Sequence, residues 1–215
     1  MPAKTSRART DEQKLFRRQA ILDAADQHFR DVGFEGFSMS RLAKQAEVAK
    51  GTLYLYFATR EEMLLALCIT RLRAWAEAVK TLAVHGMSDK DFATMIYETA
   101  LADETMMPLL IRLDLVIEHN VAIDKLVESK REMRAELERL AEISASVLDL
   151  NPHQASDVVR SFATLLIGAT RVDQGPSFED EDLPEDIREF MNAFSSEELF
   201  TTNACHILAG IRANR

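Results

Sequence analysis

The sequence is poor in cysteine, glycine and proline: among 215 residues it has 2 Cys, 7 Gly and 5 Pro. Two cysteines, Cys68 and Cys205, are too few for a disulfide-stabilised secreted scaffold. The N-terminus is polar and basic, without the apolar segment of a signal peptide, so we expect reduced thiols and a cytoplasmic protein. The scarcity of glycine and proline removes most of the turns that a β-sandwich or barrel needs and favours long helices.

Long apolar runs and catalytic signatures are also missing. The longest apolar runs, such as Met106–Ile111, are far shorter than the roughly 18 residues of a membrane span. The histidines are scattered, and the sequence contains no HExxH, no GxSxG and no Gly-rich phosphate loop. We therefore expect no membrane span, no bound metal, no cofactor and no enzymatic activity.

The net charge of −9 at pH 7 is distributed unevenly. Residues 1–60 hold 11 Lys and Arg against 7 Asp and Glu, a balance of +4. The remaining residues hold 15 Lys and Arg against 28 Asp and Glu, a balance of −13. A basic front on an acidic body allows one end of the molecule to face phosphate, so the net charge does not exclude a nucleic acid partner.

The apolar residues recur at helical spacing over most of the chain. Ile21, Ala25 and Phe29, for example, share one face of a predicted helix, and Asn151 before Pro152 is an N-cap signal. No segment alternates convincingly with the period of a strand. We expect an all-α protein with helices at about 11–32, 39–46, 50–56, 60–85, 89–102, 105–119, 122–149, 152–172, 184–194 and 196–213.

Residues 38–57 read SMSRLAKQAEVAKGTLYLYF and predict two short helices joined by a tight turn. The helices would cover 39–46 and 50–56, with Ser38 as a cap of the first, and the apolar residues Leu42 and Leu53 would pack the pair together. This is the pattern of a helix-turn-helix, whose second helix enters the major groove of DNA.

The polar residues around this motif have chemistry that suits DNA. Lys50 would place a cation at the start of the second helix, and Gly51 beside it would let backbone approach DNA closely. Hydroxyls and backbone N–H groups at helix starts suit phosphate. The alternative for the aromatic residues is a place in the core, which is what we expect of Phe57. We predict DNA contacts from Ser38, Ser40, Lys50, Gly51, Thr52, Tyr54, Tyr56, Thr59 and Arg60.

Residues 17–67 resemble the DNA-binding region of the tetracycline-repressor (TetR) family. The resemblance lies in Ile21-Leu22-x-Ala24-Ala25-x-x-x-Phe29, Gly33-Phe34, Leu42-Ala43-x-x-Ala46, Val48-x-Lys50-Gly51-Thr52-Leu53-Tyr54-x-Tyr56-Phe57 and Arg60-Glu61-Glu62. It implies that Lys50, Tyr54, Tyr56 and Arg60 fall on DNA-contacting positions.

The same resemblance implies the organisation of the chain. An N-terminal three-helix helix-turn-helix DNA-binding domain would occupy residues 1–60, with 1–10 as a flexible tail. A linking helix would join it to a helical ligand-binding and dimerisation domain at 61–215.

Two residues depart from the family pattern in the turn. Glu47 stands where the family usually has glycine, and a non-glycine residue with positive φ is costly. Ala49 stands where serine or threonine usually caps the recognition helix, which removes a cap that contributes about 1 kcal/mol.

Apolar stripes on the last two long predicted helices indicate a helix–helix interface. Two such helices from each of two subunits would form a four-helix interface, whereas the alternative is that they complete the core of one subunit. The residues expected in the dimer interface are Phe162, Leu165, Ala169, Phe200, Ala204, Ile207 and Ile211.

A ligand pocket would lie between the middle helices, where methionine and aromatic residues suit an apolar or amphipathic ligand. For each candidate the alternative is an ordinary core position. Pro108, inside the predicted helix 105–119, would kink that helix and act as a hinge. The candidate lining residues are Trp75, Phe92, Met95, Met107, Leu110, His119 and Phe162.

Together these patterns predict a homodimeric transcriptional repressor. It would bind a pseudo-palindromic operator in double-stranded DNA and be released by an unidentified small-molecule effector. An activator, a regulator without a ligand, and a ligand-sequestering protein without DNA binding remain as alternatives.

Overall fold

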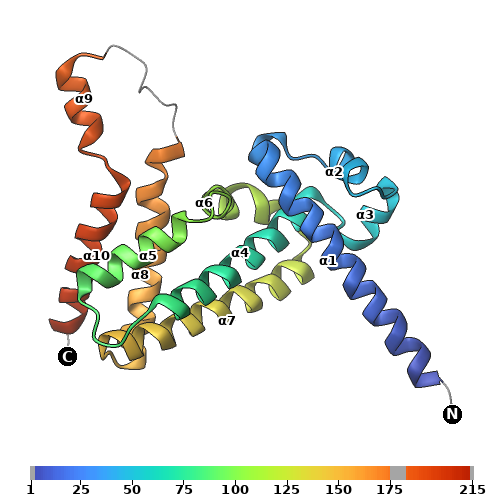
Figure 1. Ribbon diagram of the computed structural model, residues 1–215, viewed down its shortest axis with the longest axis horizontal. Coiled ribbons are helices and arrows are strands. Elements are labelled where there is room, and N and C mark those ends of the chain that lie inside the picture. Colours follow the sequence, from blue (N-terminus) through green and yellow to red (C-terminus); the bar gives the residue numbers. More distant parts are fainter. Residues whose placement is uncertain (1–2, 175–182, 214–215) are drawn as a thin grey trace. The chain divides into compact units, whose positions relative to one another are not determined.

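The computed structural model describes the backbone of residues 3–174 and 183–213, and all regular structure in these ranges is helical (Figure 1). The all-α prediction is confirmed. None of the described helices is both long enough and apolar enough to cross a membrane. The helices are α1 (Ala3–Gly36), α2 (Met39–Gln45), α3 (Lys50–Tyr56), α4 (Arg60–Leu82), α5 (Asp89–Leu101), α6 (Met106–Ile111), η1 (Leu113–Ile117), η2 (Glu118–Asn120), α7 (Ile123–Leu148), α8 (Pro152–Thr170), η3 (Val172–Gln174), α9 (Glu185–Asn192) and α10 (Ser196–Ala213).

Local signals fixed several helix ends where the sequence predicted them. The side chain of Asn151 accepts a hydrogen bond from the Gln154 backbone N–H (3.0 Å), and the Gln154 side chain accepts one from the Asn151 N–H (3.2 Å). Pro152 occupies the first position of α8, where its missing N–H has no partner to lose. The start of α8 is therefore determined by three residues within a stretch of four, Asn151, Pro152 and Gln154.

The first helix begins earlier than expected. Residues 3–10, predicted as part of a flexible tail, belong to α1, and residues 1–2 lie outside the described ranges. Near its other end α1 is interrupted at Gly33, whose φ of 65° and ψ of −172° are not helical. Because a side chain is strained at such a φ, glycine allows the chain to bend here.

The helix predicted at 105–119 is broken, but the prediction that Pro108 kinks it is wrong. Pro108 lies in the first turn of α6, where a proline loses no intrahelical hydrogen bond. The change comes at Arg112, whose carbonyl accepts from the N–H groups of both Val116 and Ile117, each at 3.1 Å. From there the chain forms the π-helical turn η1 and then the 3₁₀ turn η2.

The chain divides into two compact units. The first contains the residues up to Thr70 together with Arg112–Ser129, so it extends beyond residue 60. Its core is formed by one face of α1, with Ile21 and Phe29, against Leu42 of α2 and Leu53 of α3, all buried. This packing of α1, α2 and α3 holds the helix-turn-helix together.

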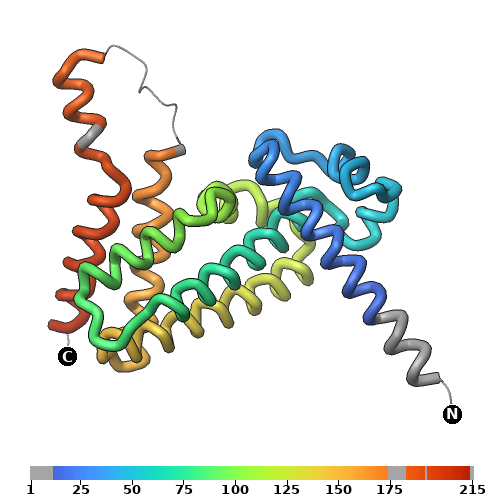
Figure 2. The backbone as a smooth tube through the Cα atoms, viewed as in Figure 1, coloured from blue at the N-terminus to red at the C-terminus, as the bar shows by residue number. Residues whose placement is uncertain are grey.

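The second unit contains Arg71–Ile111 and the residues from Lys130 onward. Helices α5, α8 and α10 lie side by side within it (Figure 2). A chain of aromatic rings links them: Phe162 lies 6.2 Å from Phe92 and 5.5 Å from Phe200 between ring centroids. The Tyr97 hydroxyl forms a hydrogen bond of 2.5 Å with the Ser196 hydroxyl. Both groups are buried, so this contact satisfies polar atoms inside an apolar core.

Candidate nucleic-acid interface

Helices α2 and α3 form the predicted helix-turn-helix. Leu42 and Leu53 are fully buried between the helices, and Ala43 is small enough for α3 to approach α2 closely. The connection is tied to α2 by hydrogen bonds from the Ala46 N–H to the Leu42 carbonyl (2.8 Å) and from the Val48 N–H to the Ala43 carbonyl (3.0 Å). The apolar residues Leu42, Ala43 and Leu53 therefore face inward, and most polar residues of the motif lie on the outer surface.

The turn keeps its backbone conformation without the usual glycine. Glu47 has a φ of 52°, in the left-handed region that glycine favours. Ala49 stands at the N-cap of α3 with extended backbone angles, and its side chain makes no cap hydrogen bond. Both departures noted in the sequence thus remain as local sources of instability next to the recognition helix.

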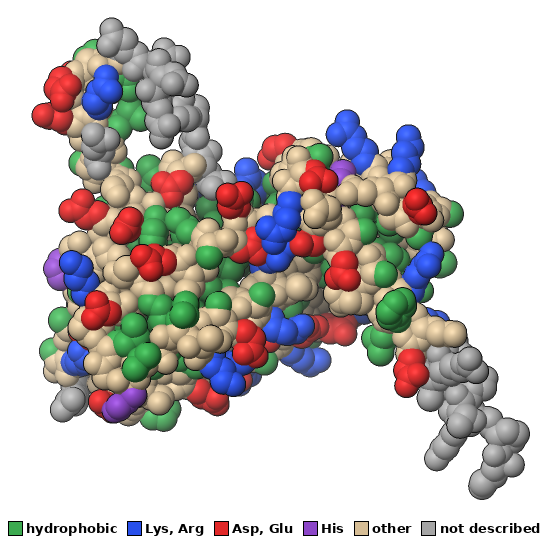
Figure 3. Space-filling model, in the orientation of Figure 1, with side chains coloured by type: hydrophobic (Ala, Val, Ile, Leu, Met, Phe, Trp, Pro, Cys, Tyr) green, Lys and Arg blue, Asp and Glu red, His purple; other side chains and the backbone are tan. Residues whose placement is uncertain are grey.

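The residues predicted to contact DNA differ in exposure. Four of the nine candidates are exposed, namely Ser40, Lys50, Gly51 and Tyr54, whereas the other five are partly buried. The Lys50 Nζ lies 5.8 Å from the centroid of the Tyr54 ring, one helical turn further along α3. Figure 3 shows Lys and Arg side chains projecting around α2 and α3. The partly buried candidates are Ser38, Thr52, Tyr56, Thr59 and Arg60.

Ser38 does not cap α2, contrary to the prediction, because its side chain makes no cap hydrogen bond. Its backbone N–H donates to Nε2 of His28 (3.3 Å), a buried side chain of α1. This contact fixes the entry into α2 from the first helix.

Sequence reasoning missed two exposed cations on α2, Arg41 and Lys44. They are three residues apart and thus on one face of the helix. The first helix of a helix-turn-helix crosses the DNA backbone, so cations on its outer face are placed for phosphate contacts. Their three-residue spacing is visible in the sequence and is the signal that identifies them.

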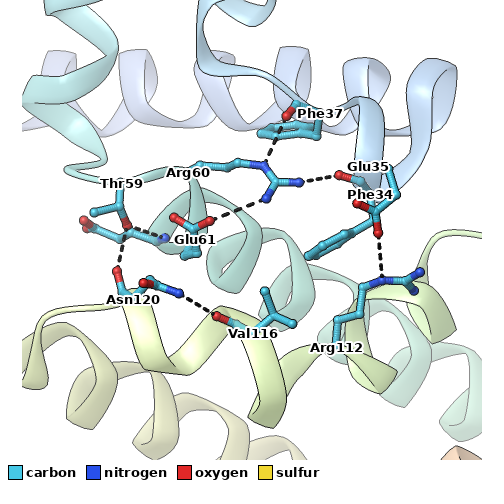
Figure 4. A network of polar contacts seen from close by, with 10 residues as sticks. Phe34, Glu35, Phe37, Thr59, Arg60, Glu61, Arg112, Val116 and Asn120 are labelled. Atoms are coloured by element: carbon cyan, nitrogen blue, oxygen red, sulfur yellow. Dashed lines mark hydrogen bonds and ion pairs between the residues drawn. The ribbon is translucent and has the colours of Figure 1, made fainter.

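Arg60 and Thr59 are engaged in contacts within the first unit (Figure 4). The Arg60 guanidinium donates to the Phe37 carbonyl (3.1 Å) and to the Phe34 carbonyl, and it lies 4.7 Å from the centroid of the Phe34 ring. The Thr59 hydroxyl accepts from the Glu62 N–H (3.0 Å) and thereby caps α4. These contacts fasten the end of α1 to the start of α4.

The same network includes the segment that follows α6. The Arg112 guanidinium lies 4.8 Å from the centroid of the Phe34 ring, and its Nε is 3.7 Å from a Glu35 carboxylate oxygen. The Thr59 hydroxyl donates to the Asn120 carbonyl (3.2 Å). The Phe34 ring therefore contacts two guanidinium groups, that of Arg60 in α4 and that of Arg112, the residue before η1.

Six of the seven predicted ligand-binding residues lie in the second unit, whereas His119 is an exposed residue of the first. The six are buried or packed against the core, and the Trp75 indole N–H donates to the Thr99 hydroxyl (3.0 Å). Met107 also lines a cleft of about 190 Å³ beside α6. Four of the six are core residues, namely Phe92, Met95, Met107 and Phe162, and two are partly buried and pack against the core, namely Trp75 and Leu110.

The seven residues predicted for a dimer interface fall into two groups. Phe162, Ala169, Phe200 and Ala204 are buried within a single chain, so the alternative of a place in the subunit core applies to them. They face a neighbouring helix of the same chain, because α10 packs against both α8 and α5. The partly buried members of the set are Leu165, Ile207 and Ile211.

Two consecutive parts of the chain match family models. Residues 21–67 match the model described as "Bacterial regulatory proteins, tetR family", and residues 69–214 match "Tetracyclin repressor-like, C-terminal domain". The Fatty acid metabolism regulator protein of Bacillus subtilis (strain 168) is 29% identical over 141 residues, which are 64% of this chain and 67% of that protein.

Two solved structures share the fold. A possible TetR family transcriptional regulator from Streptomyces coelicolor A3(2) is 17% identical with a TM-score of 0.59, over 92% of this chain and all of that one. A TetR variant from Acinetobacter baumannii AYE, crystallised with minocycline, is 16% identical with a TM-score of 0.56, over 91% of this chain and 96% of that one.

Proposed function

Because the chain belongs to the tetR family of DNA-binding transcriptional regulators, we propose that it is a ligand-released repressor that binds a pseudo-palindromic operator as a homodimer. The family is one of regulators and not of enzymes. One observation carries the proposal: the helix-turn-helix presents cations outward and is fastened through Arg60, Phe34 and Arg112 to the segment that continues directly from α6.

On the DNA side, Lys50, Gly51 and Tyr54 of α3 would enter the major groove, where exposed side chains reach base edges. Ser40 and the cations of α2 would contact phosphate on either side of the groove. Thr52 and Tyr56, which are partly buried, would contact DNA by their hydroxyl groups at the margin. Thr59 and Arg60 would hold the motif together instead.

The dimer would form through the outer faces of α8 and α10. Leu165, Ile207 and Ile211 are only partly covered within one chain and would become buried against the partner. Gly168 and Gly210 support this arrangement, because a Cβ atom at either position would meet nothing within 4 Å, which leaves room for a partner helix. Two recognition helices about one DNA turn apart would then read the two half-sites.

The effector would bind in the second unit, beside α6. The cleft there has a volume of about 190 Å³, whereas pockets for drug-sized ligands have roughly 300–1,000 Å³. An effector that enters it would therefore part α6 from the end of α8, and α6 is covalently continuous with Arg112. The lining residues are Leu101, Asp103, Glu104, Met107, Pro108, Thr170 and Asp173.

The apolar side of this cleft and the name of the B. subtilis relative make a long-chain fatty acid the first effector to test. Fatty acids are amphipathic, and methionine adapts its shape to flexible apolar chains.

The test is a titration of the purified protein against fluorescent DNA from the intergenic region beside its own gene, at several salt concentrations. Random DNA of equal length is the control. We expect preference for the intergenic DNA and two protomers per site. In Lys50→Ala we expect weaker binding, with the log–log salt slope reduced by about one if Lys50 contacts phosphate.

Palmitate is then added to the complex, with butyrate as a control that has the same carboxylate but a short chain. Release of the DNA by palmitate but not by butyrate supports an effector that binds through an apolar chain. Binding no better than to random DNA, both here and across a genomic pool, would overturn the repressor proposal.

A further inference from the structure

The outward face of α3 carries an apolar residue that none of the polar contacts proposed above requires. Leu53 and Phe57 point into the first unit and are fully buried, whereas Leu55 is 84% exposed. Gly51 and Tyr54, which precede Leu55 by four residues and one residue, are exposed with it. At helical spacing these three residues form one surface, which is the surface that a recognition helix turns toward DNA.

Single exposed leucines are common on protein surfaces, so exposure alone does not indicate a contact. Leu55 is distinguished by its place and its surroundings. It is the most exposed large apolar side chain in the part of the chain that the structure describes. One turn before it, a Cβ atom on Gly51 would meet nothing within 4 Å, so the surface beside the leucine is open to a partner.

The chemistry of leucine restricts what it can read in DNA. Its side chain has no hydrogen-bond donor or acceptor, so it cannot read the polar edges of the bases. The apolar group that the major groove presents is the 5-methyl group of thymine. Because Gly51 adds no side chain, a base pair could come close enough to α3 for this methyl group to reach Leu55.

We propose that Leu55 recognises a thymine in each operator half-site by contact with its 5-methyl group. This inference rests on the proposed DNA-binding function and adds a base preference to it. Lys50 and Tyr54, which lie together at the start of the same face, would supply the polar contacts that flank this thymine.

The expected effect follows from the size of one methyl group. Burial of a methyl-sized group changes an equilibrium by about fourfold. Replacing the critical thymine in both half-sites should thus weaken dimer binding by about fifteenfold.

The experiment uses the operator recovered from a genomic DNA pool with the full-length protein. Each symmetric pair of thymines is replaced in turn by deoxyuridine, which lacks only the methyl group. The dissociation constant is measured by fluorescence anisotropy for the wild type and for Leu55→Ala. We expect one pair at which deoxyuridine weakens the wild type about fifteenfold and leaves Leu55→Ala unchanged. Deoxy-5-bromouridine at that pair, which restores the bulk, should restore wild-type binding.

Leu15→Ala is the matched control, because Leu15 is also an exposed leucine of the first unit, at 67%, but lies on α1. It should retain the sensitivity of the wild type to deoxyuridine. The inference is overturned if no thymine pair behaves in this way, or if Leu55→Ala and the wild type lose affinity equally at every pair. Failure of the wild type to prefer any operator over random DNA would instead refute the proposed function itself.

Discussion

The contacts of Arg60 predict that its replacement destabilises the free protein. The guanidinium donates hydrogen bonds to the Phe34 and Phe37 carbonyls and lies against the Phe34 ring. A hydrogen bond from a charged group contributes about 1.5–3 kcal/mol, and a cation–π contact about 0.5–1 kcal/mol. The side chain is 27% exposed, so water compensates part of the loss, and we expect Arg60→Met to lower the free energy of unfolding by about 2–4 kcal/mol.

The assay is urea denaturation followed by far-ultraviolet circular dichroism, at one protein concentration and without DNA. Thermal unfolding should show a lower Tm for Arg60→Met, by roughly 4–12 °C. Arg60→Lys should lose about half as much, because an ammonium group keeps the charge but cannot bridge two carbonyls as a planar fork does.

Arg41→Met is the control for a cation with another role. Arg41 is exposed on α2, so its loss should leave the urea midpoint unchanged and weaken DNA binding. An unchanged midpoint for Arg60→Met, together with weakened DNA binding, would refute the reasoning and make Arg60 a DNA contact.

Three further changes are predicted from single contacts. Ala49→Ser would add a hydroxyl acceptor at the N-cap of α3, where the Thr52 N–H already donates to the Ala49 carbonyl (2.8 Å), and should raise the free energy of unfolding by about 0.5–1 kcal/mol; an unchanged urea midpoint would contradict this. Glu47→Gly should stabilise the turn by about 0.5–1 kcal/mol, the left-handed strain less the entropy of glycine, whereas Glu47→Ala, which keeps the Cβ atom, should not. Burial raises the pKa of Tyr97; its contribution to stability is complete below the ordinary tyrosine pKa and is lost as the pH rises above it, so Tyr97→Phe should have a flatter profile of Tm against alkaline pH. Identical profiles of Tm against pH for the wild type and Tyr97→Phe would show that ionisation of Tyr97 does not cause the loss of stability at alkaline pH.

Features set by neighbouring residues could be predicted from the sequence. The cap at Asn151 and the two helices around Leu42 and Leu53 depend on contacts within a few residues. For the same reason the sequence showed that the turn at Glu47 lacked its glycine. Hydrophobic spacing and cap chemistry are local properties, which a single sequence contains in full.

The role of Arg60 could not be predicted in this way. A cation at the start of a helix after the recognition helix fits a phosphate contact, and the family resemblance implies one. Its observed partners, the carbonyls of Phe34 and Phe37, lie more than 20 residues earlier in the chain. Only the tertiary structure brings them to the guanidinium.

The apolar stripes of α8 and α10 illustrate a second limit of prediction from the sequence. The periodicity correctly marked Phe162 and Phe200 as residues that need covering, but it does not state what covers them. In the structure the two rings cover each other and contact Phe92 and Tyr97 of α5. A buried stripe looks the same in the sequence whether its partner helix comes from the same chain or from another copy.

The π-helical turn after Arg112 determines the direction in which the following chain faces. Each residue of an α-helix adds about 100° of rotation about the helix axis, and a π turn accommodates one residue more than an α turn. Had the chain continued as a regular α-helix through η1, Asn120 would point to a different side and its carbonyl would not meet the Thr59 hydroxyl. A sequence that is one residue shorter between Leu113 and Ile117 could therefore form a regular α turn there and still bring Asn120 to the Thr59 hydroxyl.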